Sequence, residues 1–250
     1  MKENKQTFPS EKVTLPSKGL LYPKNSPLSK GVIEMKYMTA REEDILTNQT
    51  LIQKGEVIDE LLKSLIVTKG VDYNDLLVGD KNAIMVAARV LGYGADYSFT
   101  YNNEEHTINL SEIEDKTMDE SLIKDGENKF YFTLPTSKVE VTFKLLSHGD
   151  EKALEAELKG LRKLNKNASP DVSTRMKHMI TSVNSDSEKK TIREFVDNSL
   201  LARDARELRN YVADIQPDVD LAFDFEDSRG DLKRVDIPIE VGFFWPDASV

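Results

Sequence analysis

The sequence predicts an α+β protein that is rich in helix, with two or three β-hairpins and an extended basic arm at its N-terminus. Apolar residues recur with the helical period of about 3.6 residues over several long stretches. Between these stretches and after the last one, apolar and polar residues alternate, as they do in half-buried strands. The arm is indicated by the prolines and lysines that crowd the first 36 residues and favour extended backbone.

The 250 residues are 39% hydrophobic and 31% charged, so the chain can bury a core as one large domain or two small ones. We divide it into the arm (1–36), a region with a helical hairpin, a central helix and β-hairpins (37–164), and a region with C-terminal helices, a final hairpin and an aromatic tail (165–250). No apolar run approaches the roughly 18 residues that span a bilayer, and the start lacks the apolar stretch of a secretory signal. We therefore expect no membrane contact, and no disulfides because cysteine is absent.

Charge is distributed unevenly along the chain. The arm carries seven lysines and three glutamates, a net charge of +4, whereas the remainder carries −14. The overall charge of −10 disfavours nucleic-acid binding, which relies on lysine and arginine to neutralise phosphates. We expect the apolar side chains of residues 15–23 (LPSKGLLYP) to occupy a groove, so that the arm wraps over another surface. Residues 1–12 fit a flexible solubilising leader equally well.

Two helices are predicted directly after the arm. Thr39 and Glu42 can form a capping box at the start of the first helix, which we expect to run to about Lys54. A second helix follows Gly55 and carries a broad apolar stripe. The two should form a helical hairpin.

The central buried helix is predicted at residues 79–94, which are apolar nearly all round after the first turn. Arg89 lies within this helix, and burying an unpaired guanidinium is strongly unfavourable. We expect its tip to reach solvent or to meet a carboxylate, in a structural and not a catalytic role.

Alternation predicts a hairpin at residues 97–110 and a second strand pair at 129–134 and 138–145. Helices should then resume, and a further helix is expected to be capped by Ser169, with Pro170 in its first position. The core face of that helix is predicted to consist of Val172, Met176, Met179, Ile180 and Val183.

One long helix is predicted at residues 191–215. Its apolar positions have the spacing of a heptad seam, but two repeats are too few for a coiled coil, so packing within the domain is favoured. The seam consists of Leu201, Ala205, Leu208, Val212 and Ile215. A final hairpin at 219–239 repeats the aromatic alternation of the hairpin at 97–110, and the two are candidates for a degenerate internal pair.

The closing segment leads an alternating strand into Phe243, Phe244 and Trp245, the only tryptophan, followed by Pro246. Three adjacent aromatic side chains bury far more apolar surface than a soluble protein leaves in water. We expect them to dock on this chain or on a partner, and both alternatives stay open.

Signatures of catalysis are largely missing from the sequence. It contains no G-x-x-x-x-G-K-[ST] phosphate loop, no G-x-S-x-G nucleophile elbow and no H-E-x-x-H zinc helix. Residues 148–151 (HGDE) are able to ligate a metal or transfer protons, but acidic residues also favour the first turn of a helix for electrostatic reasons. We therefore predict no enzyme, no catalytic, cofactor-binding or metal-binding residue, and no cofactor.

Five blocks resemble one known family. They are residues 15–23 (LPSKGLLYP), 37–46 (YMTAREEDIL), 79–84 (GDKNAI), 191–196 (TIREFV) and 243–247 (FFWPD). In this order they are similar to the baseplate hub subunit and hub assembly proteins of T4-type tailed phages, over nearly the whole chain. The resemblance implies a late protein of the virion, located in the tail baseplate and assembled in the host bacterial cytoplasm.

The function implied by this resemblance is that of a structural subunit acting by protein–protein contact in baseplate hub assembly. A transient hub-assembly chaperone that is absent from the mature virion is the alternative, and an enzyme such as a cell-wall hydrolase accessory is less favoured. The expected partners are other baseplate or hub proteins, with no nucleic acid and no membrane, and a homo-oligomer stays open. The predicted partner-binding residues are Leu15, Pro16, Leu20, Leu21, Tyr22, Phe243, Phe244, Trp245 and Pro246.

Some relatives in this family carry Cys-x-x-Cys pairs in the turns of the two hairpins, similar to zinc knuckles. Here those turns read YNNEE (101–105) and EDSRGD (226–231), so no thiolate is available. His106 and its neighbouring carboxylates supply too few good ligands for a structural zinc. We predict no zinc site, and expect aromatic alternation and turn chemistry to hold the hairpins.

Overall fold

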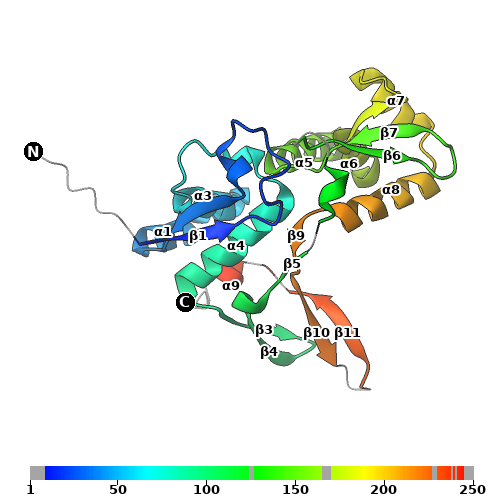
Figure 1. The fold of residues 1–250 in the computed structure, drawn as a ribbon. Coiled ribbons are helices and arrows are strands. Elements are labelled where there is room, and N and C mark those ends of the chain that lie inside the picture. Colours follow the sequence, from blue (N-terminus) through cyan, green and yellow to red (C-terminus); the bar gives the residue numbers. More distant parts are fainter. Residues whose placement is uncertain are drawn as a thin grey trace, which may run out of the picture.

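The computed structural model describes residues 9–244 except 117, 124–126, 165–169, 227–229, 238 and 240. The α+β, helix-rich prediction is confirmed, since helices alternate with small antiparallel sheets (Figure 1). The helices are α1 (Ala40–Leu46), α2 (Gln49–Lys54), α3 (Val57–Leu65), α4 (Val78–Tyr93), α5 (His148–Leu164), α6 (Asp171–Met179), α7 (Lys189–Asn198), α8 (Ala202–Ile215) and the short α9 (Val241–Phe244). Short 3-10 turns lie at η1 (Pro27–Lys30), η2 (Tyr73–Asp75), η3 (Leu110–Glu112) and η4 (Glu120–Leu122).

The strands form four pairs and one three-stranded sheet within the described residues. The pairs are β1 (Ser10–Thr14) with β2 (Val32–Lys36), β3 (Asp96–Tyr101) with β4 (Glu104–Asn109), β5 (Asp115–Lys116) with β9 (Asp218–Val219), and β10 (Ala222–Glu226) with β11 (Leu232–Asp236). The larger sheet has the order β6 (Phe130–Thr133), β7 (Glu140–Phe143) and β8 (Ile180–Val183). The predicted hairpins at 97–110 and 219–239 and the strand pair at 129–145 are therefore present.

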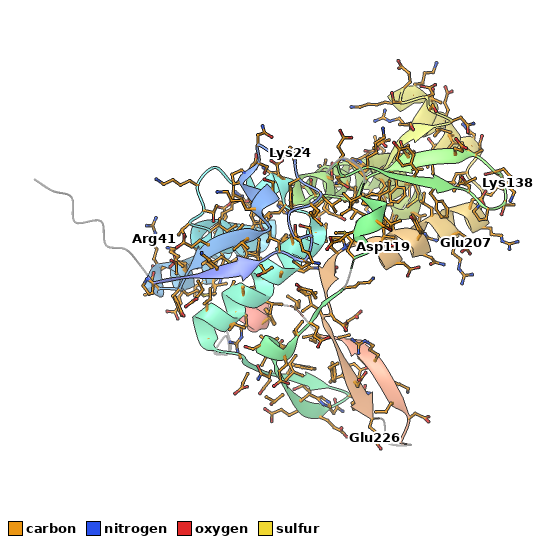
Figure 2. All side chains as sticks on the ribbon, viewed as in Figure 1. Lys24, Arg41, Asp119, Lys138, Glu207 and Glu226 are labelled. Atoms are coloured by element: carbon orange, nitrogen blue, oxygen red, sulfur yellow. The ribbon has the colours of Figure 1, made fainter. Side chains whose placement is uncertain are left out.

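Three groups of elements surround α4 in Figure 1. The β1–β2 pair and α1 to α3 lie on one side of α4. Helices α5 to α8 and the three-stranded sheet form a lobe beyond the N-terminal end of α4. The two aromatic hairpins lie below: β3 follows α4 directly, and β5 and β9 lie between the hairpins and the lobe. Buried apolar residues from all three groups join in one core, so the regions predicted at 37–164 and 165–250 share packing. Charged side chains such as those of Lys24, Lys138 and Glu226 point outward at the edges (Figure 2).

The described part of the arm returns on itself. β1 pairs with β2 in register from Ser10 opposite Lys36 to Thr14 opposite Val32. The loop between them turns sharply at Gly19, which has a φ of 77°. A side chain there would collide with the backbone of Ser29 and Gly31, so the close approach requires glycine. The loop thereby becomes compact enough to pack against α4.

The helix predicted to run from Thr39 to Lys54 is interrupted, and this part of the prediction is wrong. The expected capping box of Thr39 and Glu42 is present and opens α1. The side chain of Asn48 then accepts hydrogen bonds from the amides of Thr50 (3.0 Å) and Leu51 (3.2 Å), which starts α2 as a separate helix. Asparagine favours such a cap because its short side chain competes with helical hydrogen bonds.

Two further helix predictions need correction. Ile180 and Val183 lie in β8 and not on a helix, because α6 ends at Met179 and the β-branched stretch that follows pairs with β7. Val172 is 47% exposed and does not belong to the core face. The cap predicted at Ser169 lies outside the described residues.

The predicted long helix at 191–215 is divided into α7 and α8 around Leu200. The amides of Ser199 and Leu200 both donate to the carbonyl oxygen of Phe195, which ends α7. Leu201 precedes α8 and is 46% exposed, whereas the other four seam residues are buried in the core. The expectation of packing within the domain therefore holds for those four residues. None of the described helices is long and apolar enough to span a membrane.

Candidate functional site

The predicted partner-binding residues near the N-terminus face the core of their own chain. Leu15, Pro16, Leu21 and Tyr22 are buried, and Leu20 is half-buried. Burial within the chain is enough to explain why this segment is apolar, and no partner is needed for that explanation. Partner binding by these residues stays a prediction.

The predicted aromatic tail also packs on this chain as far as it is described. Phe243 and Phe244 have no exposed surface, and α9 packs against α4. The ring of Phe243 meets that of Tyr97 edge to face at a centroid distance of 4.9 Å, and the ring of Phe244 at 5.0 Å. Trp245 and Pro246 lie outside the described residues.

The start of α4 joins segments that are far apart in the sequence. Asp80 is buried and accepts hydrogen bonds from the amide of Ser17 (2.9 Å), the hydroxyl of Ser17 (2.6 Å) and the hydroxyl of Tyr22 (2.5 Å). Burial raises the pKa of Asp80, although these hydrogen bonds favour its charged form. The hydroxyl of Tyr22 also accepts from the amide of Leu77 (2.9 Å), so the arm is fixed to the first turn of α4.

The neighbours of Asp80 contact other parts of the chain. A Cβ on Gly79 would overlap the carbonyl oxygen of Pro217, so the absence of a side chain allows the C-terminal segment to cross α4 closely. The amide group of Asn82 donates to Asp218 (2.9 Å), the first residue of β9. Lys81 points to the opposite side, toward α3 and α5.

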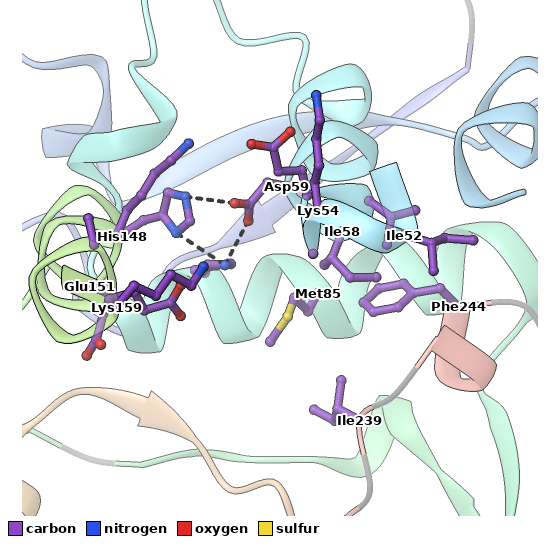
Figure 3. Close-up of a pocket in the computed structure, with 17 residues that line it drawn as sticks. Ile52, Lys54, Ile58, Asp59, Met85, His148, Glu151, Lys159, Ile239 and Phe244 are labelled. Atoms are coloured by element: carbon purple, nitrogen blue, oxygen red, sulfur yellow. Dashed lines mark hydrogen bonds and ion pairs between the residues drawn. The ribbon is translucent and has the colours of Figure 1, made fainter. Parts of the chain in front are cut away.

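Lys81 lies at the polar end of a groove of about 710 Å³ between α2, α3 and α5, with α4 as its floor (Figure 3). Figure 3 shows Asp59 and His148 facing each other at one end, with Phe244 at the other. The apolar lining includes Ile52, Val57, Ile58, Met85, Ile239 and Phe244, and the charged lining includes Lys54, Glu56, Asp59, Lys81, Glu151, Lys152, Glu155 and Lys159.

A network of charged and polar side chains closes the polar end. The ammonium group of Lys81 donates to Asp59 Oδ1 (3.0 Å) and lies 3.2 Å from His148 Nδ1. The hydroxyl of Tyr73 also donates to Asp59 Oδ1 (3.0 Å). His148 Nε2 lies 3.1 Å from Asp59 Oδ2, in an ion-pair contact whose angle falls outside that of a hydrogen bond.

Two pKa values in this network are displaced in ways that agree with its geometry. Burial lowers the pKa of His148, and the neighbouring ammonium of Lys81 lowers it further. Burial alone would raise the pKa of Asp59, but the hydrogen bond and charge of Lys81 outweigh it and lower the pKa. Near neutral pH the network therefore consists of a carboxylate, an ammonium and a neutral imidazole.

This arrangement favours a structural role for the network over a role in proton transfer. An ammonium group only donates, so His148 Nδ1 accepts from Lys81 and the ring proton resides on Nε2, beside Asp59. Both ring nitrogens are thus directed at groups of the same chain. A general base needs a nitrogen or oxygen within reach of a substrate, and His148 offers none.

Arg89 is buried, and the expectation that its tip reaches solvent or meets a carboxylate is wrong. Its guanidinium donates to the carbonyl oxygens of Gly94 (2.8 Å) and Asp96 (3.0 Å), at the end of α4, and no carboxylate pairs with it among the described residues. The rings of Tyr93 and Tyr97 lie within 5.6 Å and 5.9 Å of its guanidinium carbon. The role is structural, because the side chain fixes the turn from α4 into β3.

The two predicted hairpins pack together through their aromatic faces. Phe99 meets Phe223 at a centroid distance of 4.9 Å, and Tyr101 meets Phe225 at 5.2 Å. The ring centroid of His106 lies 5.3 Å from that of Phe223 and 5.3 Å from that of Phe225. Among the described residues no group of His, Cys, Asp and Glu has the geometry to hold a metal ion.

Sequence reasoning identified His148 but missed Asp59 and Lys81. Asp59 had the appearance of an ordinary acidic residue in the first turn of a helix. Lys81 lay in the first turn of the predicted central helix and carried no signal of its own. Spacing along the sequence carries no signal for their meeting, because the three residues come from α3, α4 and α5.

Comparison with known proteins gives one match. A family model described as T4 bacteriophage base plate protein matches residues 12–232, which is most of the chain. No curated protein and no solved structure matches.

Proposed function

The chain belongs to the T4 bacteriophage base plate protein family, and within this family we propose that it is a structural subunit of the hub at the centre of the tail baseplate. It acts there by contact with other baseplate proteins. The family match carries the proposal, because it extends from the folded arm to the last hairpin. It is not confined to one short motif but covers most of the chain.

Two features of the molecule support a role in assembly over a role in catalysis. The ring nitrogens of His148 face Lys81 and Asp59 at 3.2 Å and 3.1 Å, so the polar groups at this end of the groove face one another and not an open site. Outside that network, half-buried apolar side chains line the groove, which favours a protein ligand.

A transient assembly chaperone is the second candidate function. Such a factor uses the same surfaces as a permanent subunit, but it leaves before the particle is complete. An enzyme such as a cell-wall hydrolase accessory is the third, and lysis of purified cell wall by the isolated protein would reveal it.

Quantitative mass spectrometry of purified particles and of the lysate that produced them distinguishes these functions. A hub subunit should be present at a small fixed number of copies per particle, in constant ratio to other baseplate proteins. Abundance in the lysate together with absence from particles would reject the subunit and favour the chaperone. Wall lysis by the purified protein would reject both.

A further inference from the structure

The apolar part of the groove has side chains that the chain itself leaves partly uncovered. Ile52, Ile58, Met85 and Ile239 are half-buried, and they line the same groove as the fully buried Phe244. They come from α2, α3, α4 and the segment before α9, so the fold brings them together from separate elements. A cavity of about 710 Å³ is large enough for one bulky side chain and its neighbours.

The charges inside the groove are already neutralised by internal partners. Asp59 is held by Lys81 and lies beside His148. Glu151 accepts two hydrogen bonds from the guanidinium of Arg175, at 2.5 Å and 3.0 Å. Neither carboxylate is left to attract an incoming cation.

The charges at the rim favour an acidic ligand. Lys54, Lys152 and Lys159 are exposed, and none of them pairs with a carboxylate in the described parts of the chain. Glu56 and Glu155 are the acidic residues that share this rim. Cations therefore predominate here, although the chain as a whole carries a net charge of −10.

We propose that this groove binds a short segment of a neighbouring baseplate protein, with one bulky aliphatic or aromatic side chain flanked by carboxylates. The apolar side chain rests on Ile58, Met85 and Ile239, and the carboxylates meet the lysines at the rim. Apolar contact provides most of the affinity, and the charges select and orient the segment. The inference rests on the proposed function, since it identifies a surface by which a baseplate subunit is held.

Charge reversal at the rim tests the electrostatic part of the inference. A phage lacking the gene is complemented with K54E/K159E, and copies per purified particle are measured by mass spectrometry. We expect incorporation to fall about tenfold, because attraction at two positions becomes repulsion. The conservative variant K54R/K159R should retain incorporation, since it keeps both charges.

A matched control separates the groove from the overall charge. K24E/K69E changes the net charge by the same amount at two exposed lysines outside the groove lining, and it should leave incorporation unchanged. Thermal unfolding by circular dichroism verifies that every variant folds. Equal losses in both reversal variants, or no loss in either, would overturn the inference.

Photo-crosslinking identifies the occupant. A benzophenone amino acid replaces Ala156, which is exposed on α5 and lines the groove. After irradiation of particles and lysate, the crosslinked peptide should come from another baseplate protein and contain a bulky apolar residue close to Asp or Glu. A crosslink to a second copy of this chain, or to its own residues 245–250, contradicts the inference.

The experiment also separates this inference from the proposed function. Particles that contain the chain but give no crosslink reject the groove and leave the hub subunit intact. Particles without the chain reject the hub subunit. If particles lack the chain, a crosslink to a baseplate protein in the lysate still supports the groove, as the surface used by a transient assembly factor. No crosslink in the lysate would reject the groove as well.

Discussion

Residues 79–82 at the start of α4 each serve a different part of the molecule. Gly79 admits the backbone of Pro217, Asp80 holds the arm, and Asn82 bonds to β9. Lys81 joins α3 to α5 through Asp59 and His148. A short stretch of sequence therefore determines where three groups of elements meet, and single substitutions there should have effects beyond α4.

Gly79→Ala should destabilise the protein by about 1–3 kcal/mol, because its methyl group would overlap the carbonyl oxygen of Pro217. Gly160→Ala is the matched control, since a Cβ there meets no atom within 4 Å and the residue lies inside α5. That change should stabilise by up to about 1 kcal/mol through helix propensity. Urea unfolding measures both, and equal effects of the two changes would refute the steric explanation.

Asp204 should make stability depend on acid pH. Burial pushes its pKa upward, but hydrogen bonds from Ser137 and Thr136 outweigh that effect and hold the pKa at about 2, below its ordinary 3.8. A lowered pKa in the folded state means that the stabilisation is complete above the ordinary value and is lost as the pH falls through about 2. The carboxylate accepts hydrogen bonds from the amides of Thr136 (2.7 Å) and Ser137 (2.9 Å), which connects α8 to the β6–β7 turn.

Asp204→Asn should therefore lower the Tm at neutral pH, and its difference from the unmodified protein should shrink as the pH falls from about 4 to 2. Asp214→Asn serves as the control, because Asp214 is exposed on the same helix. Thermal unfolding across this pH range is the measurement. A Tm difference that stays constant down to pH 2 would show that the charge of Asp204 is unimportant.

Among the elements, those set by local signals were predictable from the sequence. The hairpins followed from alternation, and α1 followed from its capping box. The interruptions at Asn48 and Leu200 were missed because apolar periodicity continues across them. Strand β8 was missed because its identity depends on pairing with β7, a contact between residues about 40 positions apart.

The groove was not predictable for the same reason. His148 was identified as a polar residue at the start of a helix, but its partners are supplied by two other helices. The apolar residues near the N-terminus, together with Phe243 and Phe244 in the tail, were expected to be covered, and they are covered by their own chain. Their burial against α4 and the core depends on long-range contacts that no local pattern specifies.

Contact between the two hairpins should contribute to stability through aromatic pairing. A double-mutant cycle with Phe99→Leu and Phe223→Leu should give a coupling energy of about 0.5–1.5 kcal/mol, because the rings meet edge to face at 4.9 Å. Phe99→Leu combined with Phe132→Leu is the control, since Phe132 stacks on Tyr211 in the other lobe. Those two should be additive within about 0.5 kcal/mol in urea unfolding. Additivity in the test pair would mean that the hairpins pack independently.

At the scale of the whole molecule, we expect one cooperative unfolding transition. Leu76 accepts a hydrogen bond from the amide of His148 (2.7 Å), and Val78 donates to Leu146 (3.2 Å), so the lobe of α5 to α8 is continuous with α4. The β5–β9 pair adds a second connection. Calorimetric and van't Hoff enthalpies should then agree. Two separate transitions, with a protease-resistant piece near residues 129–215, would show that the lobe folds alone.

The junction at α4 also has a consequence for synthesis. The ribosome completes α4 at Tyr93 and then adds 125 further residues, of which the last is Asp218, the partner of Asn82. At bacterial elongation rates of about 5–20 residues per second, that interval lasts roughly 6–25 s. During this time one side of the helix has no covering segment and is accessible to host chaperones. The residues that close the junction are thus made long after the helix that they cover, so a product truncated before Pro217 leaves that side of the helix uncovered.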